Sequence, residues 1–162
     1  MSELYPAQRP RTNLYFLVTA LFWYSNYAYI PTMSPYLTSI GISYSVIGLI
    51  GGAYGLAQLI FRVPLGILSD RIGKRKIFII SGVFFGTISS FLLYFATNPV
   101  LLWLLRFVSG ISASSWVIYT ILFSSYFAGE KTASRISFLN LANTLGVMIA
   151  KMTGSMAVEA WG

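Results

Sequence analysis

Five long apolar stretches, separated by short polar links, make up most of the chain. They lie at residues 13–36, 45–68, 77–97, 100–128 and 136–160. A helix needs about 20 mainly apolar residues to cross the hydrocarbon core of a bilayer, and each stretch reaches that length. The links contain turn and helix-capping residues such as Gly41, Asn98 and Pro99. The pattern predicts an all-α, polytopic membrane protein with five transmembrane helices, in which consecutive helices run antiparallel.

Basic residues occupy every second link. They occur before the first stretch, between the second and third, and between the fourth and fifth, as Arg9, Arg11, Arg71, Lys74, Arg75, Lys76, Lys131 and Arg135. The alternate links contain no Lys or Arg. Because positively charged loops are retained on the cytoplasmic side, the pattern predicts a multi-pass protein of the plasma membrane. Residues 1–12 are then a cytoplasmic N-terminal segment.

Composition narrows the classes of function. The chain is 56% hydrophobic and 9% charged, with a mean hydropathy of +0.72, whereas about a quarter of the residues in a soluble domain are charged. It has no Cys and no His, which removes thiolate nucleophiles, imidazole bases and the commonest zinc ligands. We therefore expect no enzyme, no catalytic residues, no metal and no cofactor. The net charge of +7 lies in short runs between apolar stretches, so the bilayer is the expected partner and nucleic acid is not.

The link between the second and third stretches has the most specific sequence. It reads Gly66-Ile67-Leu68-Ser69-Asp70-Arg71-Ile72-Gly73-Lys74-Arg75-Lys76. Gly66 would let another helix approach closely, and Asp70 could accept hydrogen bonds from backbone N–H groups at a neighbouring helix N-terminus. Gly73 would permit a tight turn. A plain positively charged turn would explain the basic run, but it does not require the acid and the two glycines at this spacing.

This loop resembles the signature loop of the major facilitator superfamily (MFS), which joins the second and third helices in that family. The resemblance implies twelve helices in two six-helix halves. Residues 13–162 would be helices one to five of the N-terminal half, truncated before helix six, and the missing C-terminal half would be a partner. The implied activity is secondary active transport of a small-molecule substrate by alternating access. The conformational-switch loop would consist of Gly66, Asp70, Arg71, Gly73, Lys74, Arg75 and Lys76.

Arg106 and Gly110 resemble the Arg-x-x-x-Gly pattern of the fourth helix of that family, whose Arg is associated with the central cavity. An arginine within a membrane helix is costly and normally faces the bundle interior or a water-filled cavity. The alternative is an arginine that snorkels to the outer interface, because Arg106 lies only about 10 Å of helical rise from Pro99. The cavity is the favoured interpretation.

Lys151 is a second cation inside an apolar stretch, between the small residues Gly146, Ala150 and Gly154. Some exporters of the resembled family have a Gly-Pro at this point, where this chain has Ala150-Lys151. The small residues recur every four positions and predict close helix packing. Arg106 and Lys151 have no acid near them in the first four stretches. This favours an anionic solute, or acids from absent helices that balance the two charges. More broadly, the solute could be a drug or metabolite. Lys151 could instead snorkel past Glu159 to the outer interface.

Asn26, with Tyr24, Tyr27 and Tyr29 of the first stretch, could line a polar cavity, and Asn26 and Tyr27 are further candidates for the solute pathway. Aromatic residues at helical spacing more often pack or face lipid. Pro31 and Pro35 predict bends near the end of this stretch. No Gly-rich nucleotide-binding loop ending in Gly-Lys-Ser/Thr occurs, which favours secondary over ATP-driven transport. The alternative function is a non-transporting membrane scaffold or regulatory fragment, with an apolar partner surface and no convergence of polar residues on a cavity.

Overall fold

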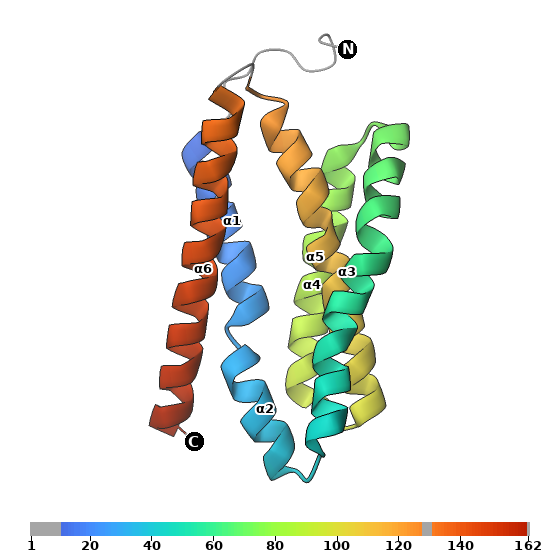
Figure 1. The fold of residues 1–162 in the computed structure, drawn as a ribbon, viewed down its shortest axis with the longest axis vertical. Coiled ribbons are helices and arrows are strands. Elements are labelled where there is room, and N and C mark those ends of the chain that lie inside the picture. Colours follow the sequence, from blue (N-terminus) through green and yellow to red (C-terminus); the bar gives the residue numbers. More distant parts are fainter. Residues whose placement is uncertain (1–10, 128–130, 162) are drawn as a thin grey trace.

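The computed structural model describes residues 11–127 and 131–161. All regular structure in those ranges is α-helical, as predicted. The helices are α1 (Thr12–Tyr27), α2 (Ile30–Ser39), α3 (Tyr44–Ile72), α4 (Arg75–Phe95), α5 (Pro99–Ser124) and α6 (Lys131–Trp161). They stand side by side as an elongated bundle (Figure 1). The five predicted crossings correspond to α1 with α2, then α3, α4, α5 and α6.

The span predicted over 13–36 consists of two helices, because α1 and α2 are separated by a break at Ala28 and Tyr29, just before Pro31. Pro31 follows the break and has no N–H to donate to the carbonyl four residues earlier, at Tyr27. Ala28 and Tyr29 keep right-handed helical dihedral angles, with φ and ψ of −89° and −7° at Tyr29. The first span is therefore a kinked rod of two segments.

Other helix ends also differ from the predicted boundaries. α3 continues to Ile72, four residues past the predicted end, because the polar residues after Leu68 still form helix and only Gly73 stops it. α6 begins at Lys131 rather than at 136. α5 ends at Ser124 rather than at 128, and residues 128–130 lie outside the described ranges. At its start, the side-chain oxygen of Asn98 accepts from the backbone N–H of Val100 at 2.9 Å, so Asn98 is an N-cap.

Three helices, α3, α4 and α5, are individually long and apolar enough to cross a membrane. α1 and α2 have 16 and 10 residues, so they reach a bilayer's thickness only together. α6 has 31 residues but carries polar side chains along its length, Lys151 among them.

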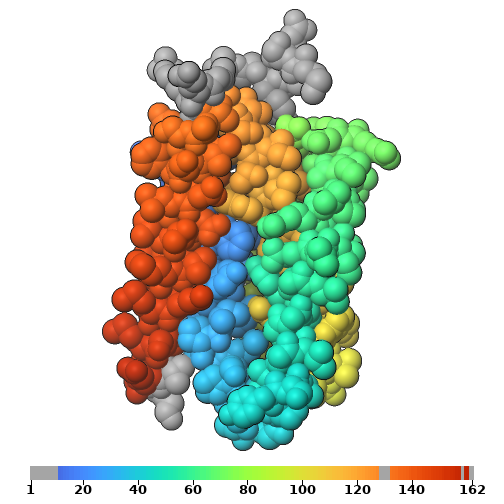
Figure 2. Space-filling model, in the orientation of Figure 1, coloured from blue at the N-terminus to red at the C-terminus, as the bar shows by residue number. Residues whose placement is uncertain are grey.

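α5 is the central helix of the bundle. It packs along α3 and α4, while α6 packs along α1 and α2. In its most apolar stretch 56% of α5 is buried, against 22% for α3 and 17% for α4. The space-filling view shows α6 and α3 on either side of α1 and α2, which are recessed between them (Figure 2). The bundle thus has an indented face made by α6, α1, α2 and α3.

The links that contain basic residues lie at one end of the bundle. The start of α1, the link between α3 and α4, and the start of α6 are together at the upper end in Figure 1, and the other two links are at the lower end. The charge alternation predicted from the sequence therefore corresponds to two opposite ends of one bundle.

Candidate functional site

The loop between α3 and α4 is closed by a glycine and an ion pair. Gly73 adopts a left-handed conformation, φ 71°, and its N–H donates to the carbonyl of Ser69 at 3.0 Å. This is the tight turn that the sequence predicts, and a residue with a Cβ would be strained there. The turn brings the first residue of α4, Arg75, back towards the last turn of α3.

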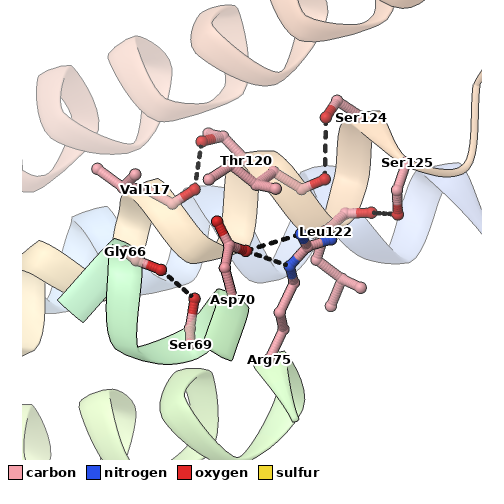
Figure 3. Close-up of polar contacts among 10 residues, drawn as sticks. Gly66, Ser69, Asp70, Arg75, Val117, Thr120, Leu122, Ser124 and Ser125 are labelled. Atoms are coloured by element: carbon pink, nitrogen blue, oxygen red, sulfur yellow. Dashed lines mark hydrogen bonds and ion pairs between the residues drawn. The ribbon is translucent and has the colours of Figure 1, made fainter. Parts of the chain in front are cut away.

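Asp70 accepts hydrogen bonds from Nε and Nη2 of Arg75, at 3.2 and 2.8 Å. In the described residues the partner of Asp70 is thus a side chain at the start of α4, and the predicted acceptance from backbone N–H groups of a neighbouring helix stays a prediction. The Asp70 side chain is 53% exposed and that of Arg75 is 24% exposed. Figure 3 shows the pair beside the end of α5, where Ser124 and Ser125 bond back to their own helix.

The remaining loop residues face outward. Arg71, Lys74 and Lys76 are exposed, so three cations remain available at this end of the bundle. A Cβ added to Gly66 would meet nothing within 4 Å. The predicted close approach of another helix to Gly66 is therefore not made by the described part of this chain.

Arg106 lies inside the bundle, with 5% of its surface exposed. Its Nη1 donates to the hydroxyl of Tyr29 at 2.5 Å. The guanidinium carbon lies 4.7 Å from the centre of the Tyr54 ring and 5.6 Å from that of Tyr29, within range for cation–π attraction. The burial of Arg106 and its contacts with the half-buried Tyr29 and Tyr54 favour the cavity interpretation over snorkelling.

Lys151 is exposed on α6, and its Nζ lies 5.7 Å from the centre of the Tyr27 ring. The Tyr27 ring packs edge-on against the Tyr54 ring, with centres 6.5 Å apart. Two cations and two intervening tyrosines thus form a connected series at the level of the break in the first span. We call Arg106, Tyr29, Tyr54, Tyr27 and Lys151 the Arg106 cluster.

Asn26 and Gly110 both lie in closely packed parts of the bundle. Asn26 is 5% exposed, and its side-chain nitrogen donates to the carbonyl of Phe22, one turn earlier in its own helix. A Cβ on Gly110 would collide with the backbone carbonyl of Tyr54 and the side chain of Ala57. Gly110 therefore lets α3 and α5 approach closely, and it carries Tyr54 into contact with α5 next to Arg106.

The charge of the Arg106 cluster is not balanced within the described chain. The two acids in the described ranges are Asp70, in the last turn of α3 and paired with Arg75, and Glu159, which is exposed near the end of α6. Nε of Arg106 is buried and has no hydrogen-bond partner among the described residues. An anion would supply the missing acceptor, because a guanidinium binds a carboxylate or phosphate through two parallel hydrogen bonds.

A pocket of about 580 Å³ adjoins the cluster at Tyr29. It lies between α2, α4 and α5, and its lining residues are Tyr29, Thr32, Met33, Tyr36, Leu37, Ser90, Leu93, Tyr94 and Leu102. A second cavity, of about 30 Å³, lies nearer the basic end, between α1, α4 and α5, with Thr19, Ser115 and Tyr119 in its wall. Only the larger pocket touches a residue of the Arg106 cluster.

Comparison with known proteins identifies the family. The family description Major Facilitator Superfamily matches residues 15–162. An uncharacterized MFS-type transporter of Methanocaldococcus jannaschii is 31% identical over 136 residues, which are 82% of this chain and 34% of that protein. An uncharacterized transporter of Buchnera aphidicola is 33% identical over 138 residues, 84% of this chain and 34% of that protein. This chain belongs to the Major Facilitator Superfamily.

A shorter match links this MFS chain to the quinolone resistance protein NorA of Staphylococcus aureus, with 34% identity over 84 residues, 52% of this chain and 21% of that protein. The chain spans about a third of the length of the first two relatives. Its family and its apolar helices indicate a multi-pass membrane protein.

One residue of the cluster, Tyr54, is absent from the candidates that the sequence of this MFS chain suggests. Tyr54 has no sequence signal that marks it. Its role depends on the close, parallel packing of α3 and α5, which only the three-dimensional structure reveals.

Proposed function

We propose that this chain, residues 13–162, forms the first five spans of the N-terminal six-helix half of a secondary active transporter. The complete protein moves a small solute across the plasma membrane by alternating access, with residues 1–12 in the cytoplasm. Two observations support this. The chain matches an MFS relative over 82% of its own length but only 34% of the relative's, and its basic links lie at one end of the bundle. The absent C-terminal half provides the other wall of the pathway.

We propose further that the solute is anionic, and the observation that carries this is the environment of Arg106. It is buried, its acceptor is a neutral hydroxyl, and its Nε has no partner in the described chain. A cation left in that state inside a membrane bundle is costly unless an anion completes its hydrogen bonds. Lys151, at the same level on the indented face, adds a second positive charge.

The loop between α3 and α4 has a separate role in this proposal, in conformational switching. Asp70, Arg71 and Lys74 lie at the end of the bundle where two halves of such a transporter meet when the cytoplasmic side closes. The half-exposed Asp70 has acceptor capacity beyond its bonds to Arg75. Gly66 presents open space on the same helix, so a helix of the absent half has room to approach.

The test is transport by the full-length parent protein in proteoliposomes. Uptake and efflux are measured for a panel of carboxylates, phosphates, neutral drugs and a quinolone, the last because one relative is a quinolone resistance protein. We expect an anion to be carried, Arg106→Lys to reduce its kcat/KM by about 100-fold because the bidentate bond is lost, and Lys151→Ala to raise KM.

Arg62→Lys is the matched control, because Arg62 is an exposed arginine of α3 that bonds only to Gln58 in its own helix. It should leave transport unchanged. Transport of neutral compounds alone, indifferent to the change at Arg106, would contradict the anionic proposal. A full-length protein that inserts correctly but moves none of the panel would favour the scaffold function.

A further inference from the structure

One hydrogen bond ties α5 to the break in the first span. Tyr29, which precedes α2 directly, accepts it from Nη1 of Arg106 at 2.5 Å. The described residues include no ion pair between the first span and the rest of the bundle. The position of the break relative to α5 therefore depends on a neutral phenol bound to a cation.

Tyr29 satisfies only one edge of the guanidinium. Nε of Arg106 has no partner in the described chain, and the remaining contacts are with the ring faces of Tyr29 and Tyr54. A carboxylate or phosphate brings a full negative charge and two acceptor oxygens, which a phenol does not. An anion that reaches Arg106 therefore competes with the Tyr29 hydroxyl and binds more strongly.

The structure has space for Tyr29 to move. Tyr29 lines the pocket of about 580 Å³ between α2, α4 and α5, so its side chain can turn into that volume. The break beside it can absorb a change in helix direction, because Pro31 leaves the carbonyl of Tyr27 without its usual donor. At its far end α2 is held by Leu37, which is fully buried among Ile47 and Ile50. Movement of α2 is therefore a pivot about Leu37.

We propose that the Arg106–Tyr29 hydrogen bond is a latch that an anionic solute releases, so that binding at Arg106 changes the angle between α1 and α2. This rests on the proposed function, because an anion must reach Arg106. It adds the means by which occupancy of the site is transmitted to the first span. Tyr29 is thus a positioning residue whose hydroxyl holds the unoccupied state.

The experiment is hydrogen–deuterium exchange on the full-length parent protein in lipid nanodiscs, followed in residues 30–39. Tyr29→Phe keeps the ring and removes only the hydroxyl. Tyr44→Phe is the control, because Tyr44 is an exposed tyrosine at the start of α3 and outside the Arg106 cluster. We expect Tyr29→Phe to speed exchange in residues 30–39 by about tenfold, the size of a lost hydrogen bond to a charged group, and Tyr44→Phe to leave it unchanged.

Inorganic phosphate, added to the wild-type protein at matched ionic strength, should reproduce the change and should add nothing in Tyr29→Phe. Unchanged exchange in Tyr29→Phe would overturn the latch. Slower or unaltered exchange in wild-type protein with phosphate would overturn its release by an anion. The Tyr29→Phe result without phosphate does not depend on transport, so it separates failure of the latch from failure of the anionic proposal, which the proteoliposome assay reports.

Discussion

Contacts inside the two helix groups differ in kind from the contacts between them. α3, α4 and α5 form one group, and α1, α2 and α6 form the other. Within the groups, glycines face neighbouring helices: a Cβ on Gly82 or Gly86 would collide with serines of α5, and one on Gly146 would collide with the backbone of Ala20. Gly154 meets the carbonyl of Ala28 in the same way.

Between the groups the contacts are mainly aromatic. The ring pairs that cross are Tyr15–Tyr119, Tyr15–Phe123, Phe16–Phe123, Trp23–Trp116 and Tyr27–Tyr54, with centres 5.2 to 6.5 Å apart. We call these pairs the aromatic seam. Backbones in contact at glycines have little freedom to shift, whereas rings keep favourable contact over a range of offsets. The molecule thus has two groups with close backbone contacts at glycines, joined by an adjustable aromatic seam.

Enlarging a glycine within a group should have the largest effect on stability. Gly110→Leu places a side chain against the backbone of Tyr54 and should lower the free energy of unfolding by about 3 kcal/mol. Unfolding of the full-length parent protein in mixed detergent micelles measures this. Gly55→Leu is the matched control, because Gly55 of α3 is exposed and faces open space. Equal losses in the two variants would contradict the distinction.

Removing a ring from the aromatic seam should have an intermediate effect on stability. It should also weaken the contact between the two helix groups. Trp116→Ala removes the ring that packs against Trp23 of α1 and Tyr119 of α5. It should lower the free energy of unfolding by about 1.5 kcal/mol. Hydrogen exchange should then rise in α1 more than in α3. Trp103→Ala is the comparison, because Trp103 stacks on Phe107 of its own helix. If hydrogen exchange in α1 rises as much in Trp103→Ala as in Trp116→Ala, the aromatic seam does not couple the groups.

Loss of one hydroxyl in the seam should have a smaller effect. The Tyr119 hydroxyl donates to the carbonyl of Tyr15 at 2.9 Å and accepts from Thr19 at 3.4 Å. Tyr119→Phe should cost about 0.6 kcal/mol, the average for interhelical hydrogen bonds in membranes. The same unfolding assay measures it, with Tyr94→Phe as a control because Tyr94 is 82% exposed. A loss above that of Trp116→Ala would reverse the expected order.

The ion pair between the end of α3 and the start of α4 should matter least for stability. Asp70→Asn should change the free energy of unfolding by less than about 0.5 kcal/mol, because the pair is partly exposed. It should nevertheless slow transport, if the loop governs switching as proposed. Arg62→Gln, at an exposed residue of α3 outside the loop, should leave both quantities unchanged. A large loss of stability in Asp70→Asn would show that the loop is a structural clamp.

Sequence patterns predicted those features of the fold that depend directly on the contact of residues with lipid or water and on backbone conformation. Apolar length predicted the spans, the basic links predicted which helix ends lie together, and Gly73 predicted the turn after α3. The small residues of α6 predicted its close packing, on α1. The break at Tyr29 lies just before Pro31, where the sequence predicts a bend.

The candidate site was predictable only in part. Arg106 stands out because charge is costly in a membrane, and its burial bears out an interior position. Of its two partners, Tyr29 is among the tyrosines that the sequence suggests for a polar cavity. Tyr54 does not stand out, because it is one of 11 tyrosines, and its contact with Arg106 follows from the glycine packing of α3 on α5. Gly66 and Asp70 have the residue types expected of the loop, but their predicted neighbours are not in the described chain.

The central place of α5 also determines the order in which the protein can assemble during synthesis. The ribosome makes α3 before α4 and α4 before α5, yet α3 and α4 pack mainly on α5 and little on each other. α1 is made first and its main partner, α6, last. The early helices must therefore enter the bilayer as separate spans, with Gly82 and Gly86 of α4, which will face α5, still covered by lipid. The bundle can close only after Ser124 and then α6 have been inserted.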